Sequence, residues 1–451
     1  MNVRNLKAAA LVAALGLAAS VAVAADEERL PWGAIKAGNK EGTIPAYTGG
    51  LPDTTSPPGF KKDSGFWPDP FADDKPLYKI TGANVDQYAD KLSEGTKALL
   101  KRFPTYSVSV YPTRRSVAYP DWVIENMKKN AANPNCKMIK DGLGVEGCFG
   151  GTPFPNPKNG KEAIWNMLLA YNKGYSSWTY GDGWYVDSKG NKAMTAQVNN
   201  RFQSEYYNPN ITAEQFYADG GFYYGQSNVY SGPARSVGEG NLLKKYLDGR
   251  PDRQWSYSPG QRRVRQSPDT AYDFPVATSG GVMLYDEIYL FGGQMDRFDW
   301  KLVGMQEMII PYNAWRWTDT PSKEMLMDQH PNPDVMRWEL HRVWVVEATL
   351  KEGARHVRHK RRYYIDEDSG GGVMDGWDAA GKLSVAIYSP INPIYDKKIA
   401  RSASSWYYDF NTGVYYHSSL GADRKKGEYY NFDKVDASFY TPEGFARRTA
   451  R

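Results

Sequence analysis

The sequence predicts a mainly β (α+β) protein in which one large, curved antiparallel sheet is roofed by a few helices. Residues 337–350 are mostly apolar at even positions and more polar at odd positions, the period-two pattern of a half-buried strand. Aromatic residues make up 14% of the chain and favour strands over helices. From residue 175 onward, further strand-like segments are bounded by Gly, Pro and Asp, as expected for strands joined by short turns.

Residues 1–24 are expected to form a secretory signal peptide. Arg4 and Lys7 supply its positive charge, and an apolar run follows at residues 11–23. Ala22-Val23-Ala24 has the small residues that precede a signal-peptide cleavage site. No later run approaches the ~18 apolar residues that a membrane helix requires. We therefore expect an exported chain without a transmembrane segment, which is periplasmic if the host has two membranes.

Charge and cysteine usage restrict the possible partners. Loss of the leader removes two of the 56 basic side chains, which leaves 54 against 51 acidic ones and a net charge of +3. That excess is too small to indicate a nucleic-acid partner. Cys136 and Cys148 lie close together in a Gly-rich loop, and in an oxidising compartment they are expected to form a disulfide. Ligation of a metal ion by the two thiols is the alternative.

The remaining elements follow from local patterns. Residues 25–80 are rich in Pro, Gly and Asp and are expected to form an extended N-terminal arm. Residues 81–451 are expected to form one domain, with helices near residues 84–101, 121–132 and 160–172. Strands are predicted at residues 178–186, 193–206, 254–264, 282–291, 298–310, 337–350, 357–365, 373–377, 383–388, 404–410 and 414–416. Residues 246–252 are expected to form a short helix or turn, and the chain after residue 423 a polar tail.

A hydrophobic ligand-binding face is predicted around the strand at residues 337–350. Its members are Trp338, Leu340, Arg342, Trp344, Val346, Leu350, Trp300 and Leu302. Arg342 interrupts the apolar face, so it must either form a buried ion pair or meet a carboxylate, phosphate or ester of a ligand. The pattern fits both an open cavity and a core that the helices close.

No catalytic residue, metal site or cofactor is assigned. The sequence contains no G-x-S-x-G elbow, H-E-x-x-H motif or Walker-type phosphate loop. His356 and His359 lie among cations that disfavour a metal ion, and residues 366–368 lack the spacing of an EF-hand calcium loop. The basic runs at residues 355–362 and 262–265 are expected to be solvated, with anionic lipid head groups as the alternative partner.

Several sequence blocks resemble the family known as domain of unknown function 1329, which is grouped with the LolA and LolB carriers of bacterial outer-membrane lipoproteins. The blocks are WELHRVWVVEATLKEGARHVRHKRRYYIDED (338–368), AGNKEGTIPAYTGG (37–50), GGTPFPNPKNGKEAIWN (150–166), RRVRQSPDTAYDFP (262–275), DRFDWKLVGMQEMIIPYN (296–313) and FYTPEGFARR (439–448). The resemblance implies a LolA-like half-barrel whose apolar concave side is roofed by helices and can hold acyl chains. The resemblance also implies that the protein functions together with outer-membrane or efflux-type export components.

The predicted function is that of a periplasmic binding or carrier protein for a hydrophobic ligand, either a lipid or the acyl chains of a lipoprotein, without enzyme activity. A chain of about a dozen methylenes gains on the order of 10 kcal/mol when it leaves water, before ordering costs. One alternative is a carbohydrate-binding or glycoside-active protein that uses its Trp and Tyr side chains as sugar platforms. Another alternative is a structural protein of the cell envelope.

Overall fold

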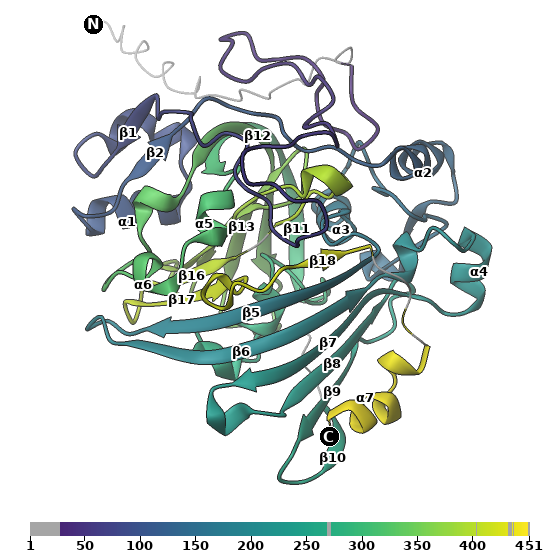
Figure 1. Cartoon of the computed structure of the whole chain (residues 1–451). Helices are drawn as coiled ribbons and strands as arrows, with labels where there is room; N and C mark the ends of the chain where they lie inside the picture. Colours follow the sequence, from purple (N-terminus) through teal and green to yellow (C-terminus); the bar gives the residue numbers. More distant parts are fainter. Residues whose placement is uncertain (1–27, 268–271, 403, 432–434, 436, 450–451) are drawn as a thin grey trace, which may run out of the picture.

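One sixteen-stranded sheet organises the chain in the computed structural model (Figure 1). The structure describes residues 28–267, 272–402, 404–431, 435 and 437–449, so the predicted signal peptide lies outside the described residues. Neighbouring strands are antiparallel except where β2 meets β12, and the two ends of the sheet do not pair with each other. The predicted fold class, mainly β with one large curved sheet, is confirmed.

Strand β12 (Trp338–Leu350) lies at the centre of the first half of the sheet, between β11 (Phe298–Pro311) and β13 (Lys360–Asp366). Beyond β13 the order is β14 (Gly372–Trp377), β15 (Leu383–Ser389), β16 (Trp406–Asp409) and β17 (Val414–Ser419). The short strands β1 (Tyr78–Ile80) and β2 (Val108–Val110) extend this half at the start of β12. The predicted strands of this half are confirmed, with ends shifted by a few residues.

The second half of the sheet begins where β17 pairs with β5. Its strands are β5 (Ser176–Val186), β6 (Lys192–Gln203), β7 (Phe222–Gly232), β8 (Gly240–Tyr246), β9 (Arg253–Ser258) and β10 (Arg263–Ser267). Strand β18 (Tyr429–Tyr430) also pairs with β5, while β3 (Lys137–Ile139) and β4 (Gly144–Glu146) form a separate hairpin.

Two strand predictions require correction, and two strands of this half were not predicted. The single strand predicted at residues 254–264 is a hairpin of β9 and β10, with Arg262 in the turn at a φ of 48°. Strands β7 and β8 were not predicted. The apolar run at residues 282–291 was predicted as a strand, but it contains the short 3-10 turn Tyr285–Glu287 and otherwise irregular backbone. The turn carries two buried carboxylates, which form ion pairs (described below) with side chains of β13 and of the residues before it.

Seven α-helices lie around this sheet within the described residues. They are α1 (Glu94–Arg102), α2 (Asp121–Ala132), α3 (Gly160–Leu168), α4 (Ala213–Ala218), α5 (Trp315–Asp319), α6 (Ser322–Met325) and α7 (Pro442–Thr449). The helix predicted at residues 84–101 is divided because Leu92 is extended, and the side chain of Ser93 caps the new helix by accepting a hydrogen bond from the Thr96 N–H. Helix α7 occupies part of the predicted polar tail, and its Phe445 is buried against β8.

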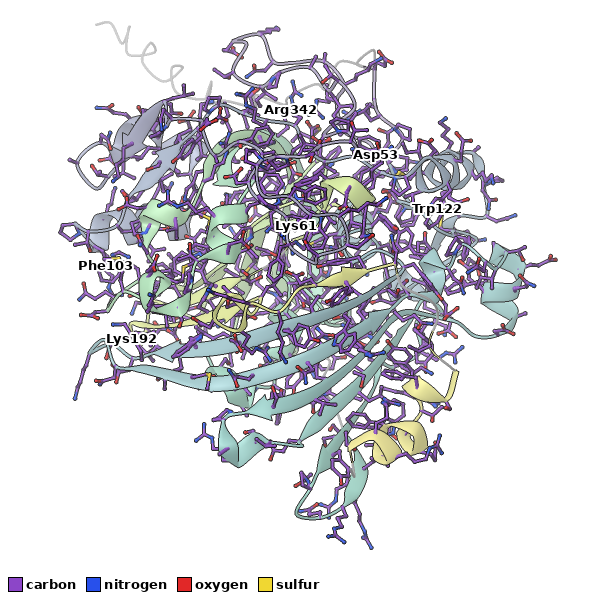
Figure 2. All side chains as sticks on the ribbon, viewed as in Figure 1. Asp53, Lys61, Phe103, Trp122, Lys192 and Arg342 are labelled. Carbon is purple, nitrogen blue, oxygen red and sulfur yellow. A yellow bond between two sulfur atoms is a disulfide. The ribbon has the colours of Figure 1, made fainter. Side chains whose placement is uncertain are left out.

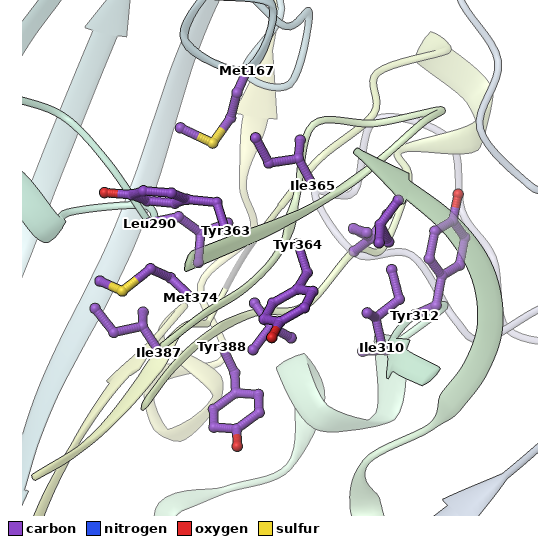
Figure 3. Close-up of a cluster of buried hydrophobic side chains, with 14 of the residues drawn as sticks. Met167, Leu290, Ile310, Tyr312, Tyr363, Tyr364, Ile365, Met374, Ile387 and Tyr388 are labelled. Atoms are coloured by element: carbon purple, nitrogen blue, oxygen red, sulfur yellow. The ribbon is translucent and has the colours of Figure 1, made fainter. Parts of the chain in front are cut away.

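Aromatic and aliphatic side chains fill the space between the first half of the sheet and its covering elements. Figure 3 shows Tyr363, Ile365, Met374 and Ile387 from three adjacent strands, together with Met167 of α3. The predicted disulfide between Cys136 and Cys148 is present and closes the loop between α2 and α3.

The N-terminal arm is held to the sheet by a buried ionic cluster of Arg115, Arg342, Glu367 and Asp368, which we call the arm cluster. Arg115 forms a two-pronged pair with Asp368, with N–O distances of 2.9 Å, and also lies 3.3 Å from Glu367. Arm backbone groups complete the cluster. Ile35 N–H donates to Glu367 at 2.8 Å, and its carbonyl accepts a hydrogen bond from Arg115 at 2.7 Å. The arm is therefore part of the folded core as well as its covering.

Strand β12 is buried on both faces, which corrects the prediction of a half-buried strand. On the odd face, the buried Glu339 carboxylate accepts hydrogen bonds from the Arg114 N–H at 2.7 Å and from Arg337 Nε at 2.5 Å. His341 stacks on Tyr312, with ring centroids 3.7 Å apart, and lies 3.0 Å from Glu339. The polar residues of this face are thus paired inside the protein, so their polarity does not indicate contact with water.

The arm cluster predicts a pH dependence of stability. Burial, followed by the charge of Asp368, raises the pKa of Glu367 to about 7 from an ordinary value of 4.5. Because the folded state favours the protonated form, this contribution to stability is complete below the ordinary pKa and is lost as the pH rises through 7. Between about pH 5 and about pH 8, we expect the free energy of unfolding of the wild type to fall more than that of Glu367→Gln. The expected difference between the two decreases is on the order of 1–3 kcal/mol.

Urea unfolding of both proteins at these pH values measures the difference. Glu324→Gln, at an exposed carboxyl, is the control and should follow the wild type. An identical pH slope in the wild type and in Glu367→Gln would show that the Glu367 pKa does not change on folding.

Candidate functional site

The eight residues predicted to form a ligand-binding face lie beneath other parts of the chain. Trp338, Leu340, Arg342 and Val346 are buried, and Trp300, Leu302, Trp344 and Leu350 are half-buried. Helix α3 covers this face closely, since a Cβ at Gly160 would lie 3.0 Å from Val346 Cγ1. The arm covers Trp344, where the Arg29 guanidinium lies 5.6 Å from the ring centroid. None of the eight lines either of the two large cavities found in the described structure, so their ligand-binding role stays a prediction.

Arg342, which is labelled in Figure 2, has partners from the protein itself. Its Nη1 donates to the Ala37 carbonyl at 3.0 Å and lies 3.4 Å from Glu367 Oε1. Of the two hypotheses for this residue, the buried ion pair is therefore confirmed. Asp368 and Glu367, considered above as calcium ligands, instead face Arg115 and Arg342. Among the residues that the structure describes, no group of three or more His, Cys, Asp or Glu side chains is arranged to hold a metal ion.

The prediction that the basic run at residues 355–362 is solvated is wrong for three of its members. His356 and Arg361 are buried and lie 3.0 and 2.7 Å from Asp286 Oδ2. Arg358 is buried 2.9 Å from Glu287 Oε1. We call these five residues the segment anchor. Burial acts to raise the pKa of Asp286, but the charges of Arg361 and His356 outweigh it and lower the pKa to about 2.

The second basic run differs from the first. Arg262, Arg263 and Arg265 are all exposed, on β10 and the turn before it. This agrees with the expectation that they are solvated.

The segment anchor fixes residues 272–292, which we call the covering segment, across the second half of the sheet. Its Tyr285, Ile288 and Tyr289 line both of the large cavities. Tyr289 and Leu290 have positive φ values of 55° and 77°, a backbone conformation that side-chain-bearing residues rarely adopt. Such strained positions persist only where the surroundings hold them, and they concentrate at functional sites.

The two cavities, of about 120 and about 190 Å³, adjoin one another between the covering segment and the inner face of β5–β9. We call them the apolar and the polar chamber, and together the hollow. Both are lined by Asn172, Lys173, Phe202, Tyr224, Gln226, Asn228, Asn241, Tyr285, Ile288, Tyr289 and Ser402. Because so many residues are shared, the chambers are two parts of one space. Together they reach the lower end of the ~300–1,000 Å³ range of small-ligand sites.

The apolar chamber is closed at one end by the C-terminal end of α3. Its hydrophobic lining consists of Met167, Leu168, Leu169, Phe202, Tyr207, Tyr223, Leu243, Ile288 and Phe291. Lys245 and Asp252 also line this chamber and lie 3.6 Å apart, and the Lys245 ammonium donates to the Gly292 carbonyl of the covering segment. The chamber therefore offers a hydrocarbon surface to a ligand, and two charged residues in its lining, Lys245 and Asp252, already pair with each other.

Apolar atoms make up the larger part of the surface of the polar chamber, but it carries more hydroxyl and amide groups than the apolar chamber does. These belong to Ser177, Thr179, Asn200, Asn228, Thr278, Ser402, Ser404, Ser405, Ser418 and Ser419. Within the described residues, three buried amide oxygens of the hollow lack a hydrogen-bond partner: those of Asn200, Asn228 and Gln254. Buried polar atoms are normally paired, so these oxygens are positioned to accept hydrogen bonds from a molecule inside the hollow.

Lys173 lies at the junction of the two chambers. Its Nζ is 4.1 Å from the centroid of the Tyr289 ring and 3.3 Å from Asn172 Oδ1. Burial, with a smaller effect of the Lys245 charge, lowers the pKa of Lys173 to about 8. The residue retains surface toward the hollow although it is deep inside the protein. The arrangement places a cationic group beside a hydrocarbon surface.

Sequence reasoning missed this site for identifiable reasons. Strands β7 and β8 carry Gln226, Asn228, Asn241 and Lys245 at positions that face the hollow, so they show no apolar alternation. The signal that could have revealed the two strands was the presence of polar residues at alternate positions of β7 and β8. No local pattern marks Lys173, because the aromatic rings around it, those of Phe202, Tyr224 and Tyr289, come from distant parts of the chain.

Comparison with known proteins identifies relatives over most of the chain. A family described as protein of unknown function, DUF1329, matches residues 79–446. An uncharacterized protein of Pseudomonas aeruginosa is 37% identical over 469 aligned positions, which cover 98% of this chain and 98% of that protein. No helix among the described residues is both long and apolar enough to cross a bilayer.

Three solved structures are similar at low sequence identity, and each aligns with 63% of this chain. A proposed outer membrane lipoprotein-sorting protein domain from Vibrio parahaemolyticus is 11% identical, with a TM-score of 0.43 over 97% of its length. A DUF1329 family protein from Desulfovibrio piger is 13% identical, with a TM-score of 0.43 over 95% of its length. A LolA superfamily protein from Nitrosomonas europaea is 8% identical, with a TM-score of 0.36 over 98% of its length.

The segment anchor predicts that Arg361 holds the covering segment in place. In Arg361→Met, the buried Asp286 carboxylate loses one of its two partners, and we expect the free energy of unfolding to fall by about 3–5 kcal/mol. Hydrogen exchange of the amides at residues 285–292 should become faster than in the wild type. Lys360→Met is the control, because the Lys360–Glu347 pair is partly exposed and should contribute at most about 1 kcal/mol. Unchanged exchange at residues 285–292 would contradict the anchoring role.

Proposed function

The chain belongs to the DUF1329 family, and we propose that it is a binding or carrier protein for an amphipathic ligand with a hydrocarbon chain, such as a lipid or the acyl chain of a lipoprotein. One observation carries the proposal: an apolar chamber that opens directly into a polar one, inside the sheet and beneath the covering segment. A ligand with a greasy part and a polar part matches both linings at once.

Burial of hydrocarbon in the apolar chamber would provide most of the binding free energy. Each methylene that moves from water into an apolar environment contributes about 0.8 kcal/mol, so even a short hydrocarbon segment gains several kcal/mol. Restriction of the ligand's motion offsets part of this gain. A chamber that is already formed in the folded protein reduces the ordering cost on the protein side. The polar chamber then accommodates the head group without leaving it unpaired.

The proposal includes a setting for this activity. We place the protein in the periplasm, where it passes its ligand to or from outer-membrane or efflux-type export components. The role is binding and transfer, without a chemical reaction on the ligand. The covering segment would lie against the bound ligand, because Tyr285, Ile288 and Tyr289 contribute to both chambers.

A saccharide is the second candidate ligand, and the polar chamber favours it. The unpartnered amide oxygens of Asn200 and Asn228 could accept hydrogen bonds from sugar hydroxyls, and the Tyr224 and Tyr289 rings line the same space. Native mass spectrometry of protein purified without detergent separates the candidates. A bound mass that extracts into organic solvent supports a lipid, whereas a bound water-soluble saccharide supports the second candidate.

A blocking substitution tests the location of the site. Asn228 lines both chambers, so Asn228→Trp should fill their junction and weaken binding of the neutral fluorescent probe N-phenyl-1-naphthylamine at least tenfold. The control is Asn199→Trp on the neighbouring strand. Asn199 precedes Asn200, which faces the hollow, so alternation places the Asn199 side chain on the opposite face of the sheet.

Titration of the probe, followed by its displacement with hexadecanol, measures both variants against the wild type. Equal affinity in Asn228→Trp and Asn199→Trp would place the site elsewhere. A wild type that binds neither the probe nor hexadecanol would overturn the proposed function.

A further inference from the structure

Lys173 differs from the other charged side chains that line the hollow, because each of those has a partner of opposite charge. Lys245 lies 3.6 Å from Asp252, Arg401 lies 2.7 Å from Glu428, and Asp182 lies 3.1 Å from Arg424. Across the described part of the chain, Lys173 makes no ion pair. Its one hydrogen-bond acceptor there is the neutral Asn172 Oδ1, although an ammonium group has three N–H donors.

The surroundings of Lys173 supply only weak compensation for its charge. The Tyr289 ring lies 4.1 Å from Nζ, and the Phe202 and Tyr224 rings lie 5.8 and 5.7 Å away. Aromatic faces attract a cation, but less strongly than a carboxylate or phosphate does at hydrogen-bond distance. The protein therefore keeps an ammonium group with unused donors at the point where the two chambers meet.

We propose that Lys173 binds the anionic group of the ligand, a carboxylate or a phosphate, while the hydrocarbon chain of that ligand occupies the apolar chamber. This inference rests on the proposed function, because it specifies the head group of the ligand that the hollow takes. The position of Lys173 supports it: the residue lines both chambers, so an anion bound there lies at the entrance of the apolar chamber.

Neighbouring groups specify the head group further. Asn228, Asn241 and Gln226 line the same junction, and the Asn228 Oδ1 atom has no hydrogen-bond partner among the described residues. Ser402 brings a hydroxyl group from the opposite wall. A head group that carries hydroxyl groups beside its negative charge would donate to these oxygens, while Lys173 holds the anion.

Matched ligands and variants of the full chain test the role of Lys173. Palmitate and hexadecanol have chains of the same length, and only palmitate carries a negative charge. We expect Lys173→Met to weaken palmitate binding about 10- to 100-fold and to leave hexadecanol binding within about twofold, because only palmitate uses a charge-assisted hydrogen bond. Lys173→Arg should retain most of the palmitate affinity. Lys244→Met is the control, since alternation along β8 places Lys244 on the face opposite to the chamber-lining Leu243 and Lys245.

Calorimetric titration of each ligand into each protein distinguishes the outcomes. Equal palmitate affinity in the wild type and Lys173→Met, with hexadecanol bound by both, would overturn the role of Lys173 and leave the proposed function intact. If the wild type binds neither palmitate nor hexadecanol, the result overturns the proposed binding function itself, and with it the role of Lys173. Titration with inorganic phosphate identifies the source of the anion. Phosphate binding that disappears in Lys173→Met, with palmitate affinity unchanged by the same substitution, would mean that Lys173 holds a free anion and not a lipid head group, and would overturn the assignment.

Discussion

The structure depends on the pairing of charges that are buried away from water. A carboxylate or guanidinium inside a protein is tolerated only when opposite charges and hydrogen bonds surround it. In this chain, two such clusters attach irregular segments to the sheet. The arm cluster joins residues 28–50 to the turn after β13 through Arg115 and Asp368. The segment anchor joins the covering segment to β13 and the residues before it through Asp286 and Arg361. The arm and the covering segment both lack long helices or strands, so side-chain ion pairs provide much of the interaction that holds them on the sheet.

The two clusters divide the sheet into a closed half and a hollow half. Over the first half, the arm and α3 pack directly on β11 and β12, so the apolar face of β12 belongs to the core. Over the second half, the covering segment is held at its Asp286 and Glu287 end, and a space remains between it and β5–β9. On β7, Tyr224, Gln226 and Asn228 face the hollow and line it. The hollow therefore lies between the polar positions of β7 and β8 and the segment anchored above them.

Much of the fold was predictable from local sequence, whereas the candidate site was not. The alternation at residues 337–350 and the spacing of Cys136 and Cys148 are local features, and each indicated the correct element. Local patterns failed where distant charges decide the structure. The basic run at residues 355–362 appeared solvated because its partners, Asp286 and Glu287, lie about 70 residues away. For the same reason, the apolar run at residues 282–291 was mistaken for a strand. Lys173 carries no local signal, since its significance comes from the lack of an oppositely charged partner among the described residues.

That absence is informative because of how the chain treats its other buried cations. Arg115, Arg342, Arg358, Arg361 and Arg401 each lie beside at least one carboxylate. A sequence that pairs five buried guanidiniums can also pair an ammonium, and Asn172 or Ser402 would need only a change to an acidic residue to do so. The burial that lowers the pKa of Lys173 to about 8 acts against its charged form in the ligand-free protein. A neutral side chain such as Met would avoid that penalty and fill the same space. The ammonium at the junction of the chambers, which makes no ion pair among the described residues, is therefore the feature from which we propose an anionic group on the ligand.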